Sequence, residues 1–223
     1  TNYFFEVEME DNDDLENNKK GLRKYGASKE NRPLPIVEMG LFIDGTGFPL
    51  AFNIHPGNTN EQTTLRPLEK QIMKDFQLSK FLICTDAGLG SFNNRIFNTK
   101  GDRIYIVTQS LKQLSAEYQA DALSPMGWHL LGSNKSVNIN EINKYDSKNK
   151  NIYYKEILIK RTKTDPKTKG KITLNERMIV TFSPKYAIYQ KNIRDAQITR
   201  AKEIINNHPE QYSKLSQNNA KRF

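Results

Sequence analysis

Apolar residues occur in short runs separated by turn residues, and this spacing most constrains what the chain can fold into. Two such runs, residues 36–43 and 48–54, flank the sequence Asp-Gly-Thr-Gly, which predicts a β-hairpin. The elements expected next are a helix capped by Asn58 or Thr59 and ending at Lys74, a buried strand at 80–85, a helix at about 91–98 and a strand at 103–108. This order predicts an α/β fold in which helices cross the faces of a mixed sheet.

The first ten residues alternate between apolar and acidic side chains. Phe5, Val7 and Met9 are each followed by a glutamate, which predicts a half-buried strand over residues 1–10. The sequence begins abruptly at Thr1 without an initiating methionine, so we expect it to be a piece of a longer protein.

The pattern changes after Gln109. Strand-like runs at 152–160 and 177–182 are separated by a lysine-rich segment, 162–171, which predicts a mobile hairpin tip. The chain therefore divides into a core at 1–108, a β-rich subdomain at 109–184, and a long basic helix with a polar tail at 185–223.

The predicted helix at 185–207 ends near Pro209. One face of it is expected to pack and carries Tyr186, Tyr189, Ile193, Ala196 and Ile204. Lys191, Arg194 and Lys202 lie roughly across from that face, so the helix predicts one packing side and one basic side.

The positive charge is concentrated in the last third of the sequence. The chain has a formal net charge of +9; residues 141–223 have net +11 from 19 basic and 8 acidic residues, and residues 1–140 have net −2. Such asymmetry indicates a polyanionic partner, nucleic acid first and an anionic membrane second. The alternative is a solvated basic surface with no partner.

Other features of the composition exclude several classes. Cys84 is the only cysteine, which excludes an internal disulfide and a cysteine-cluster zinc site. No apolar run approaches the roughly 18 residues of a membrane span, so we expect a soluble intracellular protein without membrane partners.

Asp86 is the strongest candidate for chemistry. It follows the predicted strand at 80–85 and precedes a glycine-rich turn, and α/β sheets place functional groups at this end of a strand. A carboxylate there could bind Mg²⁺ together with other oxygen ligands. The alternative is that Asp86 only stabilises the turn or caps the next helix. Asp44 occurs in a hairpin sequence and is interpreted as a turn residue.

Four separated stretches resemble the catalytic core of bacterial insertion-sequence DDE transposases, specifically the group with a long β-rich insertion before the last acidic residue. They are residues 25–33 (Tyr-Gly-Ala-Ser-Lys-Glu-Asn-Arg-Pro), 40–50 (Gly-Leu-Phe-Ile-Asp-Gly-Thr-Gly-Phe-Pro-Leu), 55–59 (His-Pro-Gly-Asn-Thr) and 84–89 (Cys-Thr-Asp-Ala-Gly-Leu). The resemblance covers residues 1 to about 108 and continues more loosely to about 205.

This resemblance implies an RNase H-like fold, a mixed sheet with flanking helices, interrupted by a β-rich and helical insertion subdomain. It implies three metal-binding acidic residues, of which Asp86 matches the second, as a metal ligand and catalytic residue. The first would fall just before Thr1, and neither Glu203 nor Glu210 has the surroundings of the third. We therefore expect Mg²⁺ or Mn²⁺ only in the complete active site, and an inactive fragment.

The resemblance also implies binding of double-stranded DNA, at transposon ends and target, in the bacterial cytoplasm at the nucleoid. A homodimer is expected of the full-length protein. The candidate DNA-binding residues are Lys155, Lys160, Arg161, Lys163, Lys191, Arg194, Lys202 and Trp128. Trp128 could stack on a flipped base, or it could belong to the subdomain core.

Two other functions remain open from the sequence. One is an RNase H-like nuclease that cleaves without strand transfer. The other is a DNA-binding module without enzymatic activity, in which Asp86 would have no catalytic role.

Overall fold

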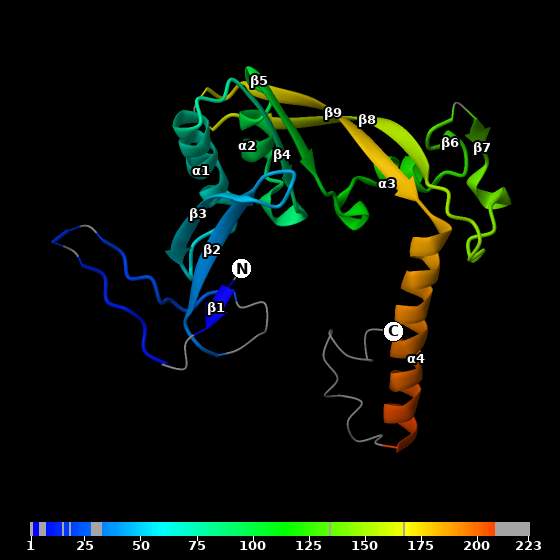
Figure 1. Ribbon diagram of the computed structural model, residues 1–223, viewed down its shortest axis with the longest axis horizontal. Coiled ribbons are helices and arrows are strands. Elements are labelled where there is room, and N and C mark those ends of the chain that lie inside the picture. The colour runs from blue at the N-terminus through cyan, green and yellow to red at the C-terminus, as the bar shows by residue number, and fades with distance from the viewer. Residues whose placement is uncertain are drawn as a thin grey trace. The chain divides into compact units, whose positions relative to one another are not determined.

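The computed structural model describes residues 2–4, 8–14, 16–17, 19–27, 33–133, 135–166 and 168–207 (Figure 1). The chain forms two compact units, residues 1–110 and 111–223. Each unit contains helices and β-strands, so the predicted α/β class is confirmed. In the described part of the chain, no helix combines the length and the apolar composition that crossing a bilayer requires.

The first sheet of unit 1 is antiparallel, with strand order β1-β2-β3 (Figure 1). Its strands are β1 (Asn2–Phe4), β2 (Ile36–Ile43) and β3 (Pro49–Pro56). The β2–β3 pairing confirms the predicted hairpin. The strand expected over residues 1–10 is shorter than predicted, because residues 8–10 have no strand structure. Residues 1 and 5–7 lie outside the described residues.

Asp44 organises the turn of this hairpin. Its Oδ1 accepts hydrogen bonds from the backbone N–H and the hydroxyl of Thr46, at 2.8 and 2.7 Å, and from the N–H of Phe48 at 2.9 Å. The side-chain bond from Thr46 and these backbone bonds hold the pKa of Asp44 below its ordinary value. The interpretation of Asp44 as a turn residue agrees with this geometry.

Helix α1 (Glu61–Asp75) follows the hairpin. Its N-cap is Asn60, whose side chain accepts from the N–H of Gln62 at 3.0 Å, so the predicted caps Asn58 and Thr59 were wrong by one or two positions. Leu65, Leu68 and Ile72, three apolar residues near helical spacing, are buried. A fourth, Phe76, is the C-cap and is exposed.

A second sheet consists of two parallel strands, β4 (Lys80–Thr85) and β5 (Asp102–Val107). The chain crosses between them through a 3-10 helix, η1 (Ala87–Leu89), and helix α2 (Phe92–Phe97). Parallel strands need such a crossover because a tight turn joins only antiparallel neighbours.

Strand β4 is buried on one face only, which corrects the expectation of a buried strand at 80–85. Ile83 is 5% exposed, whereas Leu82 and Cys84 on the opposite face are exposed. The neighbouring side chains on that opposite face, Ile104 and Ile106 of β5, are also exposed. In the described part of unit 1, helices thus cover one face of this sheet rather than both.

The expected single mixed sheet is also absent among the described residues. There β1 pairs with β2 alone, and β4 pairs with β5 alone, so the strands of unit 1 form two sheets. β1 has three residues in the described part of the chain, and these three offer few hydrogen bonds to a second neighbour.

Three segments of unit 1 meet at Gly57, where backbones approach closely. The N–H of Gly57 donates to the carbonyl of Leu22 at 3.2 Å, and Lys24 and Ile36 exchange two backbone hydrogen bonds. A Cβ on Gly57 would lie 2.5 Å from the carbonyl oxygen of Lys24 and would overlap that of Ile36. Only glycine fits this position, since a side chain would push the segments apart.

Unit 2 is built on a four-stranded antiparallel sheet with the order β7-β6-β8-β9 (Figure 1). Its elements are η2 (Leu111–Gln113), α3 (Ala116–Leu123), β6 (Trp128–Leu130), β7 (Ser136–Val137), η3 (Ile139–Glu141), β8 (Tyr153–Thr164), β9 (Lys171–Phe182) and α4 (Pro184–Asn207). One core cluster joins Leu114, Ala122, Ile157 and Ile159. A second forms around Trp128.

The β8–β9 hairpin is longer than the sequence predicted. Residues 162–164 pair with residues 171–173, so most of the segment expected to be a mobile tip continues the strands. Within the connection, the N–H of Asp165 donates to the carbonyl of Gly170 at 2.8 Å. Backbone pairing therefore extends this hairpin beyond its apolar residues.

Helix α4 begins and ends almost where expected, but its predicted packing face was wrong. Tyr186 and Tyr189 are 62% and 56% exposed, and Ile193 is 38% exposed. The less exposed positions, such as Pro184 and Ile188, lie on the other side of the helix. Helical periodicity identifies which residues share a face, but it does not say which face neighbours cover.

We expect Gly57→Ala to lower the free energy of unfolding of unit 1 by about 3 kcal/mol, because the methyl group meets two backbone carbonyls. Urea denaturation followed by circular dichroism measures this change. Gly40→Ala is the control, since a Cβ there has no neighbour within 4 Å. Equal stability of the two variants would contradict the close approach at Gly57. Fluorescence of Trp128, the only tryptophan, reports on unit 2 separately.

Candidate functional site

Asp86 lies directly after β4, at the edge where both parallel strands end. Thr85 pairs with Val107, the last residue of β5, and the N–H of Thr108 donates to the carbonyl of Thr85 at 3.2 Å. Asp86 has extended backbone angles and caps η1, with Oδ1 accepting from the N–H of Gly88 at 3.0 Å. The turn-stabilising role considered from the sequence is therefore present.

The capping bond occupies only part of the carboxylate. Asp86 is exposed, and among the described residues its Oδ2 has no hydrogen bond or ion pair. A carboxylate has about four lone-pair sites on two oxygens, so one bond to Gly88 leaves acceptor capacity that faces solvent. Capping and ligand binding by Asp86 are compatible.

A second carboxylate lies beside the same loop. A Cβ on Gly88 would be 3.2 Å from Oδ1 of Asp86 and 3.4 Å from Oε2 of Glu61, so both oxygens border the space over Gly88. Glu61 is the first residue of α1 and is exposed. No motif in the sequence marks Glu61 as a functional residue.

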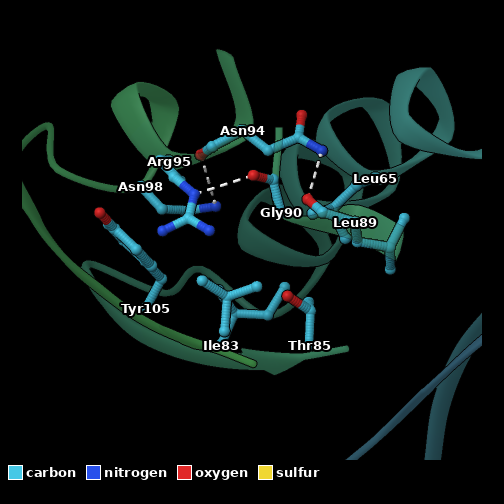
Figure 2. A pocket seen from close by; sticks show the side chains of 10 residues that line it. Leu65, Ile83, Thr85, Leu89, Gly90, Asn94, Arg95, Asn98 and Tyr105 are labelled. Atoms are coloured by element: carbon cyan, nitrogen blue, oxygen red, sulfur yellow. Dashed lines mark hydrogen bonds between the residues drawn. The ribbon is translucent and has the colours of Figure 1, made fainter. Parts of the chain in front are cut away.

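Two buried side chains of α2 hold the loop after Asp86 (Figure 2). The amide of Asn94 donates to the carbonyl of Leu89 at 2.9 Å and to the carbonyl of Gln62 at 3.0 Å. Nε of Arg95 donates to the carbonyl of Gly90 at 2.8 Å. Asn94 and Arg95 are 3% and 8% exposed. The loop and the start of α1 are thus both fixed to α2.

A small pocket lies behind this loop (Figure 2). Its lining comes from α1, β4, the loop, α2 and β5, namely Leu65, Ile83, Thr85, Leu89, Gly90, Asn94, Arg95, Asn98, Tyr105 and Val107. Asp86 is outside this lining, so the pocket belongs to the packing seam between the helices and the sheet.

Glu69 of α1 is a buried acid in the same seam. It is 0% exposed, and its Oε1 accepts from the amide of Asn98 at 2.8 Å. Its buried Oε2 has no hydrogen-bond partner among the residues that the structure describes. Burial raises the pKa of Glu69 to about 7, although the Asn98 bond and the nearby Arg103 and Arg66 act in the opposite direction.

The basic residues predicted to bind DNA all lie in unit 2: Lys155, Lys160, Arg161 and Lys163 on β8, and Lys191, Arg194 and Lys202 on α4. Successive side chains of a strand point to opposite faces, so Lys160 is separated from the other three on β8. Nζ of Lys155 donates to the carbonyl of Asp121 at 2.5 Å, and Arg161 forms an ion pair with Glu176.

The three predicted DNA-binding residues of α4 also differ in whether their side chains have a partner within the protein. Nζ of Lys191 lies 2.5 Å from Oδ2 of Asp195, one helical turn away. Arg194 and Lys202 are exposed, as is Lys160 of β8. Among the described residues, the side chains of these last three form no ion pair or hydrogen bond. They are the predicted cations that remain available to a ligand.

Trp128 lies in the core of unit 2. It is 5% exposed, it packs with Ile139 and Tyr153, and its Nε1 donates to the carbonyl of Ser124 at 2.9 Å. The ring therefore occupies the core position considered as the alternative, and a base could not stack on it in this arrangement.

The donor chemistry at the edge of β4 fits a divalent metal, because exposed carboxylate oxygens are the ligands that Mg²⁺ prefers. In the described part of the chain, no group of three or more His, Cys, Asp or Glu side chains is close enough to hold a metal ion. Asp86 with Glu61 would supply part of a coordination shell, and other oxygen donors would have to complete it.

Sequence reasoning found Asp86 and missed the residues around it. Glu61, Asn94 and Asn98 are polar residues in predicted helices, where solvent exposure is the usual expectation. The one available signal was spacing: Asn94 and Asn98 are four residues apart and so share a face of α2 with a buried side.

Comparisons of the chain with known protein families, with curated proteins and with solved structures find no match.

We expect the stability of unit 1 to fall as the pH rises from about 5 to about 8. Folded Glu69 binds its proton more tightly than the unfolded chain, whose ordinary value is 4.5, so the stabilisation is complete below that value and is lost as pH passes about 7. Glu69→Gln keeps an acceptor for Asn98 and should remove on the order of 2 kcal/mol of this pH dependence in urea denaturation.

Asp75→Asn, on the exposed end of the same helix, is the control for the loss of one acidic group. It should retain the pH dependence of the unchanged protein. If Glu69→Gln also retained it, Glu69 would not be the group that titrates in the folded state.

Proposed function

We propose that this chain is part of a DDE-type DNA transposase that cleaves and joins transposon-end DNA by metal-dependent phosphodiester transfer. The observation that carries the proposal is the location of Asp86, an exposed carboxylate at the carboxyl edge of parallel β4 and β5, on a loop fixed by buried side chains. The ordered resemblance of residues 25–33, 40–50, 55–59 and 84–89 to these transposases supports it.

The proposal extends to the fold of unit 1. An antiparallel hairpin and a parallel pair with a helical crossover are components of a mixed sheet. We infer that they belong to an RNase H-like core, and that unit 2 is the β-rich insertion with its following helix.

In this proposal Asp86 is a metal ligand and does not transfer a proton in the reaction. Mg²⁺ or Mn²⁺ bound there would activate a water or a DNA 3′-hydroxyl for attack on a phosphodiester and stabilise the leaving oxygen. Gly88 holds Oδ1 through its N–H, and Oδ2 has no hydrogen bond among the described residues, which leaves it available to a ligand. Asn94 and Arg95 keep the loop in place, so the carboxylate need not be ordered when DNA binds.

The positive charge of unit 2 supports double-stranded DNA as the partner. Lys160, Arg194 and Lys202 are exposed and would contact phosphates, which gives affinity without reading sequence. Lys155, Arg161 and Lys191 have internal partners and would contribute mainly through the overall field.

A DNA-binding module without activity is the second candidate. It is favoured by one observation, the capping bond from Gly88 to Asp86, which gives this aspartate a structural role that needs no metal. An RNase H-like nuclease shares the site of the main proposal and differs from it only in its products.

We expect Asp86→Asn to abolish DNA cleavage, with a rate loss of at least about 1,000-fold, because an amide is a poor ligand for Mg²⁺. The assay uses the whole gene product that contains these residues, paired transposon-end duplexes and Mg²⁺. Asp102→Asn, at the opposite edge of the same sheet, is the control and should stay active.

The products of this assay separate the candidates. Joined strands support a transposase, and cleavage without joining supports a nuclease. Cleavage that survives Asp86→Asn would refute the assignment of this residue, and absence of cleavage with intact DNA binding would favour the binding module.

We expect the triple variant Lys160→Gln, Arg194→Gln and Lys202→Gln to bind a labelled duplex more weakly, with the slope of log affinity against log salt reduced by about 2 to 3. Fluorescence anisotropy over a series of salt concentrations measures the slope. The control removes three exposed lysines of unit 1, at positions 74, 80 and 100, and should change the slope by less than about 1. Equal slopes for both triple variants would contradict a DNA surface on unit 2.

A further inference from the structure

The β8–β9 hairpin of unit 2 has one covered face and one face in solvent. On the covered face, Ile157 and Ile159 are buried against Leu114 and Ala122. Three consecutive cross-strand pairs form the opposite face, which we call the ribbon face: Leu158 with Arg177, Lys160 with Asn175, and Thr162 with Thr173. All six residues are exposed, and the hydroxyls of the last pair lie 3.5 Å apart. Side chains of both strands thus present one continuous surface to solvent.

Most of this hairpin is only two strands wide. β6 pairs with Tyr153 and Tyr154, and beyond them β8 pairs with β9 alone among the described residues. The major groove of B-DNA is about 12 Å wide and admits a two-stranded β-ribbon. Neighbouring strands lie about 4.8 Å apart, so a four-stranded sheet would be too wide. The hydroxyl of Tyr118 in α3 accepts from the N–H of Lys160 at 3.0 Å, so a helix supports the ribbon.

The charge of the hairpin is complementary to DNA. Its two strands carry six basic residues and two acidic ones, Glu156 and Glu176, which gives a net charge of +4. Glu176 pairs with Arg161. Oε2 of Glu156 lies 3.7 Å from Nη1 of Arg177, and such an exposed pair contributes little stability, so the guanidinium is free to turn to another acceptor.

The side chains of the ribbon face also match the chemistry of base edges. An Asn amide accepts from N6 and donates to N7 of adenine, and an Arg guanidinium donates to O6 and N7 of guanine. Leu158 is 82% exposed beside Arg177 and offers an apolar contact for a thymine methyl group. The side chain of Asn175 forms no hydrogen bond among the described residues. A phosphate needs only donors, whereas this amide also presents an acceptor.

We infer that the ribbon face enters the major groove of duplex DNA and reads base edges through Asn175 and Arg177. This inference rests on the proposed function, in which unit 2 binds double-stranded DNA through phosphates. Lys160 is then the phosphate contact of the same face. The ribbon face adds selection among base sequences to an affinity that positive charge alone supplies.

The test is selection by this chain from a pool of duplexes with a randomised centre, followed by sequencing of the bound fraction. We expect a preference at adjacent base pairs. The double variant Asn175→Ala with Arg177→Lys keeps the net charge and should bind the selected duplex about 10-fold or more weakly, because bidentate contacts are lost. Its affinity for an unselected duplex should stay the same. Asn192→Ala with Arg200→Lys, at exposed positions of α4, is the matched control and should keep the preference.

A change in the DNA tests the groove. Replacing the purines of the selected duplex by 7-deazapurines removes the N7 acceptors of the major groove. This replacement should weaken binding of the unchanged chain and have a smaller effect on the double variant. If it leaves the affinity of the unchanged chain as it was, the ribbon face does not read the major groove and the inference is overturned.

The outcomes separate this inference from the proposed function. If the chain binds duplexes without sequence preference, or if the double variant keeps the preference, base reading is refuted and DNA binding through phosphates stands. If the chain binds no duplex, the DNA partner of the proposed function fails as well. Light scattering tests a second copy as the occupant: a dimer that Leu158→Asp converts to a monomer would overturn the inference. Melting temperatures confirm that the variants are folded.

Discussion

Parallel pairing of β4 with β5 determines the architecture of unit 1. Two parallel neighbours cannot be joined by a tight turn, so the chain must return from the end of β4 to the start of β5 on one face of the sheet. It does so through η1 and α2. The crossover brings the carboxyl ends of both strands to one edge, where Asp86 begins the loop. The location of the candidate site therefore follows from strand direction.

The same crossover requires polar side chains inside the unit. The loop carbonyls of Leu89 and Gly90 point toward α2, and Asn94 and Arg95 satisfy them. An apolar side chain at either position would leave a buried acceptor unpaired, at a cost of about 1–3 kcal/mol. Asn98 and Glu69 extend this polar seam to α1. These hydrogen bonds fix the position of the loop after Asp86. Burial raises the pKa of Glu69, so the stability of unit 1 depends on pH.

Local signals explain which parts of the fold could be predicted. The β2–β3 hairpin and the bounds of β4 follow from turn residues and short apolar runs, which act over a few positions. The packing face of α4 and the burial of Trp128 depend on which elements cover them, and no pattern within a helix or strand contains that information. The candidate site divides in the same way. Asp86 was predictable from its place after a strand, whereas Glu61 lies near the same loop because Asn94 of α2 binds the carbonyls of both Gln62 and Leu89.

In unit 2, the net charge differs from the number of cations whose side chains have no acidic partner within the protein. The excess of +11 in residues 141–223 belongs to the sequence, and all of it contributes to the field that a polyanion meets on approach. Direct binding of a phosphate depends on fewer charges. At physiological salt, screening weakens the attraction of any exposed charge that lies more than about 8 Å from the phosphate. Arg161 and Lys191 already pair with acids of their own unit, whereas Lys160 has no such partner among the described residues. Pairing within unit 2 thus engages individual cations such as Arg161, and it leaves Lys160 exposed on the opposite face of β8.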